Sequence, residues 1–242
     1  MYHKNFLFII LMISGIAINS LKADVKIVEV KGDVRVRFGI EESWHKAQIG
    51  SILKNIDSIL SGENGKIVLE LENGTHFKLG SNAILDIADI REIQQRELFM
   101  YLMSQKIDKL ETKDDNTPVK VGNVSIVHGD SKQENSTVNS ISEQEDWYLL
   151  EINGALALYD HNFYPNTIIK FLKIQNKYDS IRDKGQIEYH IGKSFEALKD
   201  QGQAKDAYKR ALDEYKSTRD PSSNEQVWVA DARNALNRLN QE

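Results

Sequence analysis

The sequence predicts a two-domain protein in which an all-β domain precedes an all-α helical-repeat domain. Short apolar runs separated by glycine turns fill residues 24–87, which is typical of β structure. Residues 91–113 contain no Gly or Pro and have apolar positions three and four apart, which predicts one long amphipathic helix. From residue 143 to the end, the same helical spacing recurs in several segments.

The first 23 residues predict a secretory signal. His3 and Lys4 precede an apolar run, and Ala23 offers a small residue at a cleavage site. The apolar run, residues 6–18, is shorter than the roughly 20 residues that a membrane span needs. We therefore expect a bacterial protein that is periplasmic or otherwise exported, soluble and without stable membrane insertion once the signal is cleaved. An uncleaved N-terminal anchor is the alternative.

Composition narrows the classes of partner and of chemistry. The chain of 242 residues has a net charge of −5 and no cluster of basic residues, which argues against a nucleic-acid partner. It has no cysteine, which excludes disulfides, thiolate metal sites and cysteine nucleophiles. We expect no cofactor.

The β domain is predicted over residues 24–130, as a roll, sandwich or solenoid-like unit. Residues 34–38 alternate apolar and basic side chains, as a half-buried strand does. Asn73-Gly74 lies between two apolar runs and predicts a tight hairpin. Residues 119–127 are expected to form a later strand.

The helix expected at 90–112 is assigned to this β domain. Its apolar stripe most simply covers the β structure, because amphipathic helices bury that face. Pairing with a partner helix or lying on a membrane surface are the alternatives. The polar face mixes acidic and basic residues, which disfavours the membrane.

Residues 131–142 are polar and predict a linker. The helical domain is predicted over residues 143–242. Its helices are expected near 144–159, 163–178, 185–199, 202–217 and 225–239.

The β region resembles the FecR domain, a periplasmic module. The resemblance covers about residues 25–130, and its elements occur in the family's order. The second element, Trp44, Ala47, Gly50 and Leu53, matches the pattern W-x-x-A-x-x-G-x-x-L. The others are Gly32-Asp33-Val34, Ile56 to Gly62, Leu71 to Thr75, Thr117-Pro118, and Val127 to Asp130. The chain departs from the family pattern at Ile56, Ser61, His128 and Asp130. The resemblance implies a compact β-roll or solenoid-like fold and a role in relaying signals across the envelope.

The helical region is similar to tetratricopeptide repeats. Its best match is residues 191–212, with small or aromatic side chains at the family's spacing: Gly192, Phe195, Ala204, Tyr208 and Ala211. Glu188 stands where the family often has Trp, and Gly154 precedes Gly192 by 38 positions in a degenerate hairpin. Ala232, Ala235, Leu236 and Leu239 suit a capping helix.

This second resemblance implies a protein-binding concave surface that presents Tyr189, Lys193 and Glu196. Plain solvated surface is the alternative for these three residues. Two repeats and a cap fall short of the roughly three repeats that a stable array needs. We therefore expect the helical unit to lean on its own β domain or on a second chain, the latter through self-association.

No motif predicts catalysis. His45 and His76 could meet across strands, but two solvated histidines explain them better than a metal site does. Ser194 is interpreted as a surface serine. We expect no enzyme, no catalytic residue and no metal. The function expected is a non-catalytic scaffold or adaptor that binds other envelope proteins; the alternative is a module that senses a receptor or cell-wall ligand through the β domain.

Overall fold

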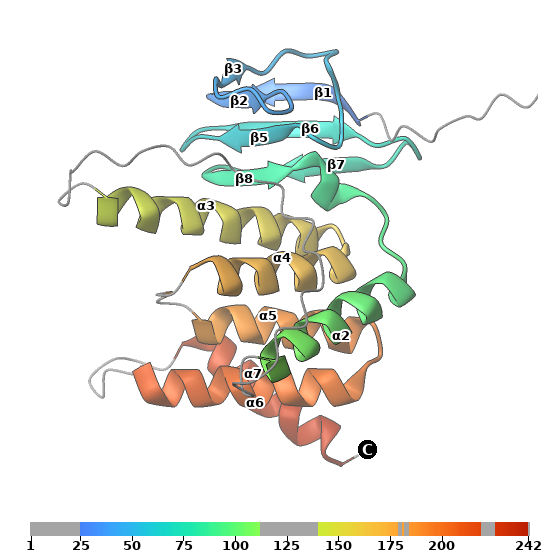
Figure 1. Cartoon of the computed structure of the whole chain (residues 1–242), viewed down its shortest axis with the longest axis vertical. Coiled ribbons are helices and arrows are strands. Elements are labelled where there is room, and N and C mark those ends of the chain that lie inside the picture. The colour runs from blue at the N-terminus through green and yellow to red at the C-terminus, as the bar shows by residue number, and fades with distance from the viewer. Residues whose placement is uncertain (1–24, 112–139, 179–180, 182–183, 219–225, 242) are drawn as a thin grey trace, which may run out of the picture.

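The structure is a computed structural model, and it describes residues 25–111, 140–178, 181, 184–218 and 226–241. In this part of the chain, a two-sheet β structure lies against one end of a stack of helices (Figure 1). The predicted order of β structure and then helices is confirmed. The expected signal segment, the expected strand at 119–127 and the last two FecR-like elements lie outside the described residues.

The β half contains two antiparallel sheets of four strands each. One sheet has the strand order β4-β1-β6-β7 and the other β3-β2-β5-β8. The strands are β1 (Val25–Lys31), β2 (Val34–Arg37), β3 (His45–Lys46), β4 (Ile52–Leu53), β5 (Ser58–Ser61), β6 (Lys66–Glu70), β7 (His76–Leu79) and β8 (Ala83–Asp86). A short 3-10 helix, η1 (Ile87–Ile90), follows β8.

Alternating side chains from both sheets fill one apolar core. Buried and exposed residues alternate strictly along β7, so that Phe77 and Leu79 point inward. Phe77 packs in the same cluster as Val36 and Leu85 of the other sheet. This is the sandwich among the predicted alternatives, whereas a β-solenoid would coil from parallel strands.

The hairpin predicted at Asn73-Gly74 is confirmed, since it joins β6 to β7. Gly74 has a φ of +77°, a conformation that glycine adopts far more readily than residues with a side chain. Its N–H donates to the Leu71 carbonyl at 2.8 Å, and the Asn73 side chain accepts from the Thr75 N–H at 2.9 Å. The turn chemistry therefore fixes the register of the two strands.

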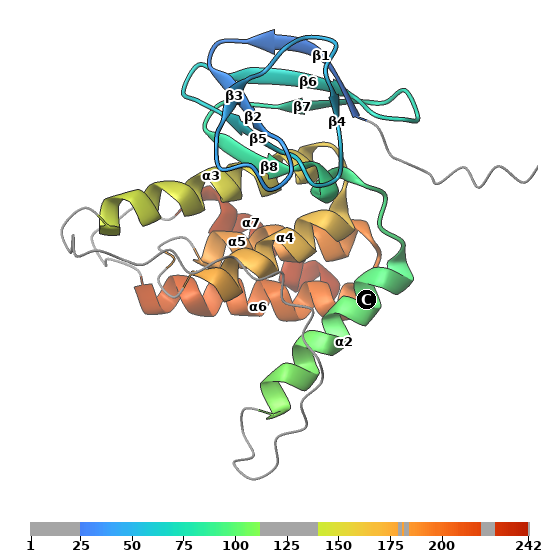
Figure 2. The ribbon, with the colours of Figure 1, turned by 45° about the horizontal axis from the view of Figure 1, so that its top comes forward.

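The helices form the other half of the molecule (Figure 2). They are α2 (Gln95–Glu111), α3 (Ser140–Asp160), α4 (Tyr164–Lys177), α5 (Lys184–Ala197), α6 (Gln201–Thr218) and α7 (Val227–Leu239). Each of the five expected C-terminal helices is present. The boundary differs, because α3 begins at Ser140 and residues 140–142 are helical rather than linker. No helix in the described ranges is long and apolar enough to cross a membrane.

Helix α2 does not cover the β sandwich, so the favoured interpretation of its apolar stripe is wrong. Leu98 is buried in the helical core cluster, and Leu102 packs against the same cluster. The Asn176 amide of α4 donates to the Gln105 side chain at 2.7 Å. An apolar stripe predicts that one face of a helix is buried, but it does not identify whether a sheet or other helices cover that face.

Helix α3 closes the open side of the sandwich. Its Gly154 lies so close to β8 that a Cβ atom there would be 2.1 Å from the Ile84 carbonyl oxygen. One turn later, Ala157 and Leu158 enter the β core. Beyond the end of α3, the His161 ring accepts a hydrogen bond from the Lys78 N–H of β7 at 2.9 Å. One helix therefore covers the edge strands of both sheets, and the expectation that the helical unit leans on its own β domain is confirmed.

A buried ion pair adds to this junction. The Lys170 ammonium of α4 lies 2.6 Å from the Asp89 carboxylate and 3.4 Å from that of Asp86. The Lys170 side chain is only 8% exposed. Burial tends to raise the pKa of Asp86, but Lys170 and the Ser58 hydroxyl outweigh burial and lower it. The Asn166 amide donates to two backbone carbonyls of the η1 region, at 2.8 Å each.

A shift of 37 positions aligns the buried residues of the two hairpins α3–α4 and α5–α6. The shift brings fully buried Ala155 onto Gly192, and the two large buried rings Phe171 and Tyr208 onto each other. It also brings Leu158, which faces the sandwich, onto Phe195, which packs in the helical core. The corresponding positions of α3 and α5 are therefore buried against different surfaces, the β sandwich and the helical core.

Candidate interaction site on helices α3, α5 and α7

The helical half has a small apolar hollow between α3 and α5. Its volume is about 170 Å³, and its floor includes Phe171 of α4. That is small beside the roughly 300–1,000 Å³ of pockets for drug-sized ligands. The hollow therefore suits one large side chain. Its lining residues are Leu149, Ile152, Asn153, Leu156, Phe171, Gln186, Ile187 and His190.

Two rows of side chains, one on α3 and one on α5, run past the hollow, and Leu149, Ile152, Leu156 and Gln186 are the members that line it. The α3 row consists of Leu149, Ile152, Leu156 and Tyr159, and the α5 row consists of Gln186, Tyr189, Lys193 and Glu196. Within each row the spacing is three, four and three residues, which is one face of a helix. The α3 row is apolar except for the Tyr hydroxyl, and Leu149 is 42% exposed. The α5 row is polar, so the surface has an apolar side and a charged side.

His190 lies where the two rows meet. Its ring is 5.4 Å from that of Tyr159 and 5.1 Å from that of Tyr189. Its Nδ1 atom is buried and has no hydrogen-bond partner. Burial lowers the pKa of His190 to about 4, so the ring is neutral at pH 7. A neutral imidazole keeps the border of the hollow compatible with an apolar occupant.

The structure brings the three predicted binding residues together, but it gives each a partner within the chain. The Tyr189 hydroxyl donates to Asp231 of α7, and the Lys193 ammonium lies 3.6 Å from the same carboxylate. Glu196 pairs with Arg238 of α7 and accepts from the Tyr208 hydroxyl at 2.7 Å. The three residues therefore hold the last helix in place, and none of them lines the hollow.

The packing predicted within the second hairpin is present. A Cβ atom on Gly192 would lie 2.8 Å from the Tyr208 ring, and Ala204 and Ala211 are fully buried. Glu188, which departs from the family pattern, is also buried. Its carboxylate accepts from Gln175 at 3.0 Å and from Arg210 at 2.9 Å, so it joins α4, α5 and α6.

Sequence reasoning missed several residues of this site. The α3 row could have been found from its helical spacing, which is visible in the sequence. Asp231 and Arg238 could not, because only the packing of α7 brings them to α5. The interpretation of Ser194 as a surface residue is wrong, because Ser194 is fully buried and donates to the His190 carbonyl at 2.8 Å.

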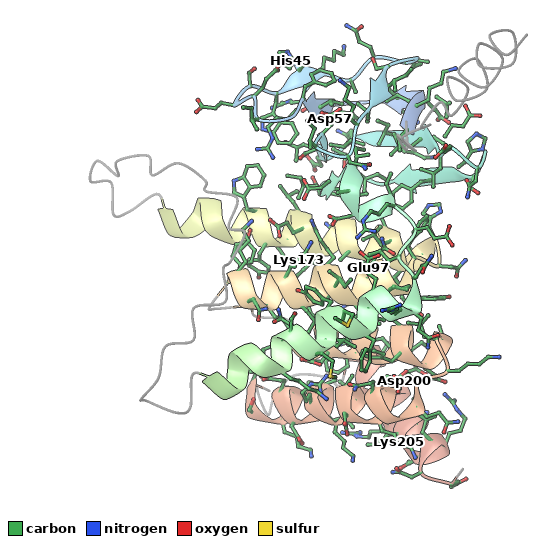
Figure 3. All side chains as sticks on the ribbon, turned by 45° about the vertical axis from the view of Figure 1, so that its right-hand side comes forward. His45, Asp57, Glu97, Lys173, Asp200 and Lys205 are labelled. Atoms are coloured by element: carbon green, nitrogen blue, oxygen red, sulfur yellow. The ribbon has the colours of Figure 1, made fainter. Side chains whose placement is uncertain are left out.

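The β half carries a second exposed apolar group, at the tips of two loops. Ile40 and Ile56 are 101% and 69% exposed. Buried Asp57 holds the loops together by accepting from the N–H groups of Gly39 and Lys54, at 2.8 and 2.7 Å (Figure 3). Next to these loops, the Arg37 guanidinium lies 5.1 Å from the centre of the Trp44 ring.

Among the described residues, no three His, Asp or Glu side chains converge as a metal site would require. His45 bonds to Glu41 and Ser43, and it lies in the sheet opposite to that of His76. Two larger open hollows, of about 620 and 680 Å³, lie between α2 and α4–α6 and beside the junction of the two halves. In the first of them, Lys184 and Arg210 are paired with Glu214 and Glu188.

Comparison of the chain with models of known protein families, with curated proteins and with solved structures found no match.

Proposed function

We propose that this protein is a non-catalytic scaffold or adaptor of the bacterial envelope, which binds another protein through the surface formed by α3 and α5. The observation that carries this proposal is the apolar row of α3, with Leu149 exposed, beside a hollow of one side chain's size between α3 and α5. Exposed apolar groups rimmed by polar ones are typical of sites of protein interaction. The groups gathered here are suited to contact rather than to a reaction.

The two family resemblances belong to this proposal. A FecR-type domain followed by tetratricopeptide-like repeats is supported by the β-then-α order and by the close packing of Gly192 on Tyr208. Export to the periplasm fits a chain without cysteine that relies on packing for its stability.

The ends of the helical stack bear on how a partner could bind. At one end the sandwich covers α3. At the other end α7 buries Val229, Ala232 and Ala235 but exposes Arg233 and Asn234. A terminal helix with a polar outer face ends a repeat array. We therefore place the partner on the side of the stack, and self-association by end-to-end stacking is disfavoured.

Site-specific photo-crosslinking in cells tests the proposal. A photoreactive phenylalanine analogue at Leu149 should give a discrete crosslink to another protein. The same analogue at Phe99, which is 55% exposed on α2, is the matched control and should not give that product. Absence of any crosslink from Leu149, with the folded protein present at normal levels, would refute the binding surface.

A second function, sensing through the β half, is favoured by the exposed isoleucines at the loop tips and by the stacking of Arg37 on Trp44. Tryptophan and arginine are the residues most often found at the energetic centres of interfaces. The same analogue at Ile40 tests this alternative. A crosslink from Ile40 and none from Leu149 would favour the sensor over the adaptor.

A further inference from the structure

We infer that the hollow between α3 and α5 receives one bulky apolar side chain of an amphipathic partner helix, whose basic residues face Asp160 at the end of α3. This inference rests on the proposed function and names the chemistry of the partner.

The size and lining of the hollow determine the anchor. About 170 Å³ accommodates a single aliphatic or aromatic side chain. Ile152, Leu156 and Phe171 supply apolar walls, and they are already only partly exposed or fully buried. Filling the hollow therefore removes mainly the apolar surface of the incoming residue from water, which favours binding without a conformational change.

The polar groups at the border favour a helix over an extended peptide. An extended segment would need partners for its own backbone N–H and C=O groups. The lining offers few such groups, because its amide side chains are those of Asn153 and Gln186, and the Asn153 NH2 group already donates to the Asn82 carbonyl at 2.7 Å. A helix satisfies its own backbone, so it can lay an apolar face against the α3 row.

The protein itself provides a precedent in α7. This helix lies beside α5 and uses an acidic and a basic residue, Asp231 and Arg238, to pair with Lys193 and Glu196. Its Trp228 ring fills the space left by Gly185, where a Cβ atom would be 2.9 Å from the ring. An aromatic anchor followed along the helix by charged residues is thus a mode of helix binding that α5 already supports.

The charged residues near the hollow determine which sign of charge the partner helix should carry. Asp160 is exposed, and no ion pair to it forms among the described residues. Its charge reaches both His190 and Tyr159, since it acts to raise the pKa of each. Glu196 and Asp231 add negative charge, which Lys193 and Arg238 balance. Asp160 is therefore the charge left for a partner's lysine or arginine.

The test measures, by fluorescence anisotropy, the affinity of the full chain for three fluorescein-labelled synthetic helical peptides of equal length. The first peptide carries a leucine stripe flanked by lysines. The second has alanine in place of the leucines, and the third has glutamate in place of the lysines. The leucine–lysine peptide should bind about 10-fold more tightly than the alanine peptide, because one Leu-to-Ala change in a filled pocket costs about that factor. It should also bind several-fold more tightly than the glutamate peptide, whose carboxylates would face the carboxylate of Asp160.

Two pairs of variants locate the peptide. Leu149→Asp should weaken binding about 10-fold or more, whereas Phe99→Asp, at another exposed apolar position, on α2, should not. Asp160→Lys should weaken binding several-fold and reduce its salt dependence, whereas Asp206→Lys on the exposed face of α6 should not. Equal effects within each pair, or equal binding of all three peptides, would overturn the inference.

The two proposals fail in different ways. A crosslink from Leu149 in cells together with no discrimination among the three peptides would leave the adaptor function standing and refute the amphipathic helix. Absence of both would refute the binding surface itself.

Discussion

Two glycines, Gly154 in α3 and Gly192 in α5, both allow close packing of a helix, but against different neighbours. Each lets a helix approach its neighbour more closely than any other residue would allow. Gly192 meets the ring of Tyr208 within the helical stack, whereas Gly154 meets the backbone of Ile84 in the sandwich. A ring can be replaced by a smaller side chain, but a backbone carbonyl cannot. The junction between the two halves is therefore less tolerant of change than the packing within the helical half.

The largest effect is expected at Gly154. Gly154→Ala places a Cβ atom 2.1 Å from the Ile84 oxygen, so α3 must move away from β8. We expect a loss of about 3 to 4 kcal/mol in the free energy of unfolding, at or above the usual cost of overpacking. Urea denaturation would measure it. The control is Gly202→Ala in α6, where the nearest atom is 3.7 Å away and a helix-favouring residue should cost nothing. Similar stabilities for the two variants would show that α3 does not press on β8.

The next effect is expected at Lys170. Lys170→Met leaves the carboxylate of Asp89, which is 12% exposed, without its partner. Removing one member of a buried pair costs about 3 kcal/mol. Thermal unfolding should show the loss. Lys173→Met is the matched control, because Lys173 lies on the exposed side of the same helix (Figure 3). An unchanged melting temperature for Lys170→Met would mean that the pair adds nothing to the junction.

A smaller loss of stability is expected at Gly192, and a second substitution at Tyr208 should relieve part of it. Gly192→Ala pushes a Cβ atom to 2.8 Å from the Tyr208 ring and should cost about 2 kcal/mol. In a Tyr208→Leu background, Gly192→Ala should cost less than it does in the wild-type protein, because the obstructing ring is gone. A double-mutant cycle in urea measures the coupling. Coupling near zero would contradict the contact.

The smallest effect is a dependence of stability on pH through His190. Its pKa is about 4 in the folded protein and 6.5 in the unfolded chain, so the unfolded chain binds the proton first as the pH falls. Stability is therefore full above pH 6.5 and is lost as the pH falls toward 4. Between pH 8 and pH 5 the loss should be about 1 to 2 kcal/mol. His190→Phe should remove this contribution, and an identical pH profile for the two proteins would contradict it.

The sequence was most informative where a local pattern decides the structure. The spacing of Gly192, Ala204 and Tyr208 predicts how α5 meets α6, and Asn73-Gly74 predicts the hairpin between β6 and β7. It was least informative about contacts between distant segments. Gly154 was paired with Gly192 at a separation of 38 positions, but burial pairs Ala155 with Gly192 at 37. One step along a helix turns a residue by about 100°, and here it separates a residue facing the helices from one facing the sandwich.

Contacts between distant segments also explain why the position of α2 was predicted wrongly and why the residues of α7 were missing from the predicted site. The stripe of α2 would suit a sheet or a helix pair equally well, and Leu98 alone does not reveal which. Tyr189, Lys193 and Glu196 lie on one face of α5, as their spacing of four and three residues indicates. Their pairing with α7 depends on the path of the chain after α6, which local spacing does not encode.

The sealing of the sandwich by α3 has a consequence for how this chain is made. His161 bonds to Lys78 across 83 positions of sequence, and Ala157 and Leu158 complete a buried core whose other members lie before residue 91. During vectorial synthesis, the strands emerge long before the segment that covers them. Contacts of such long range form late and slowly. The nascent strands therefore lack part of their apolar core until α3 has been made.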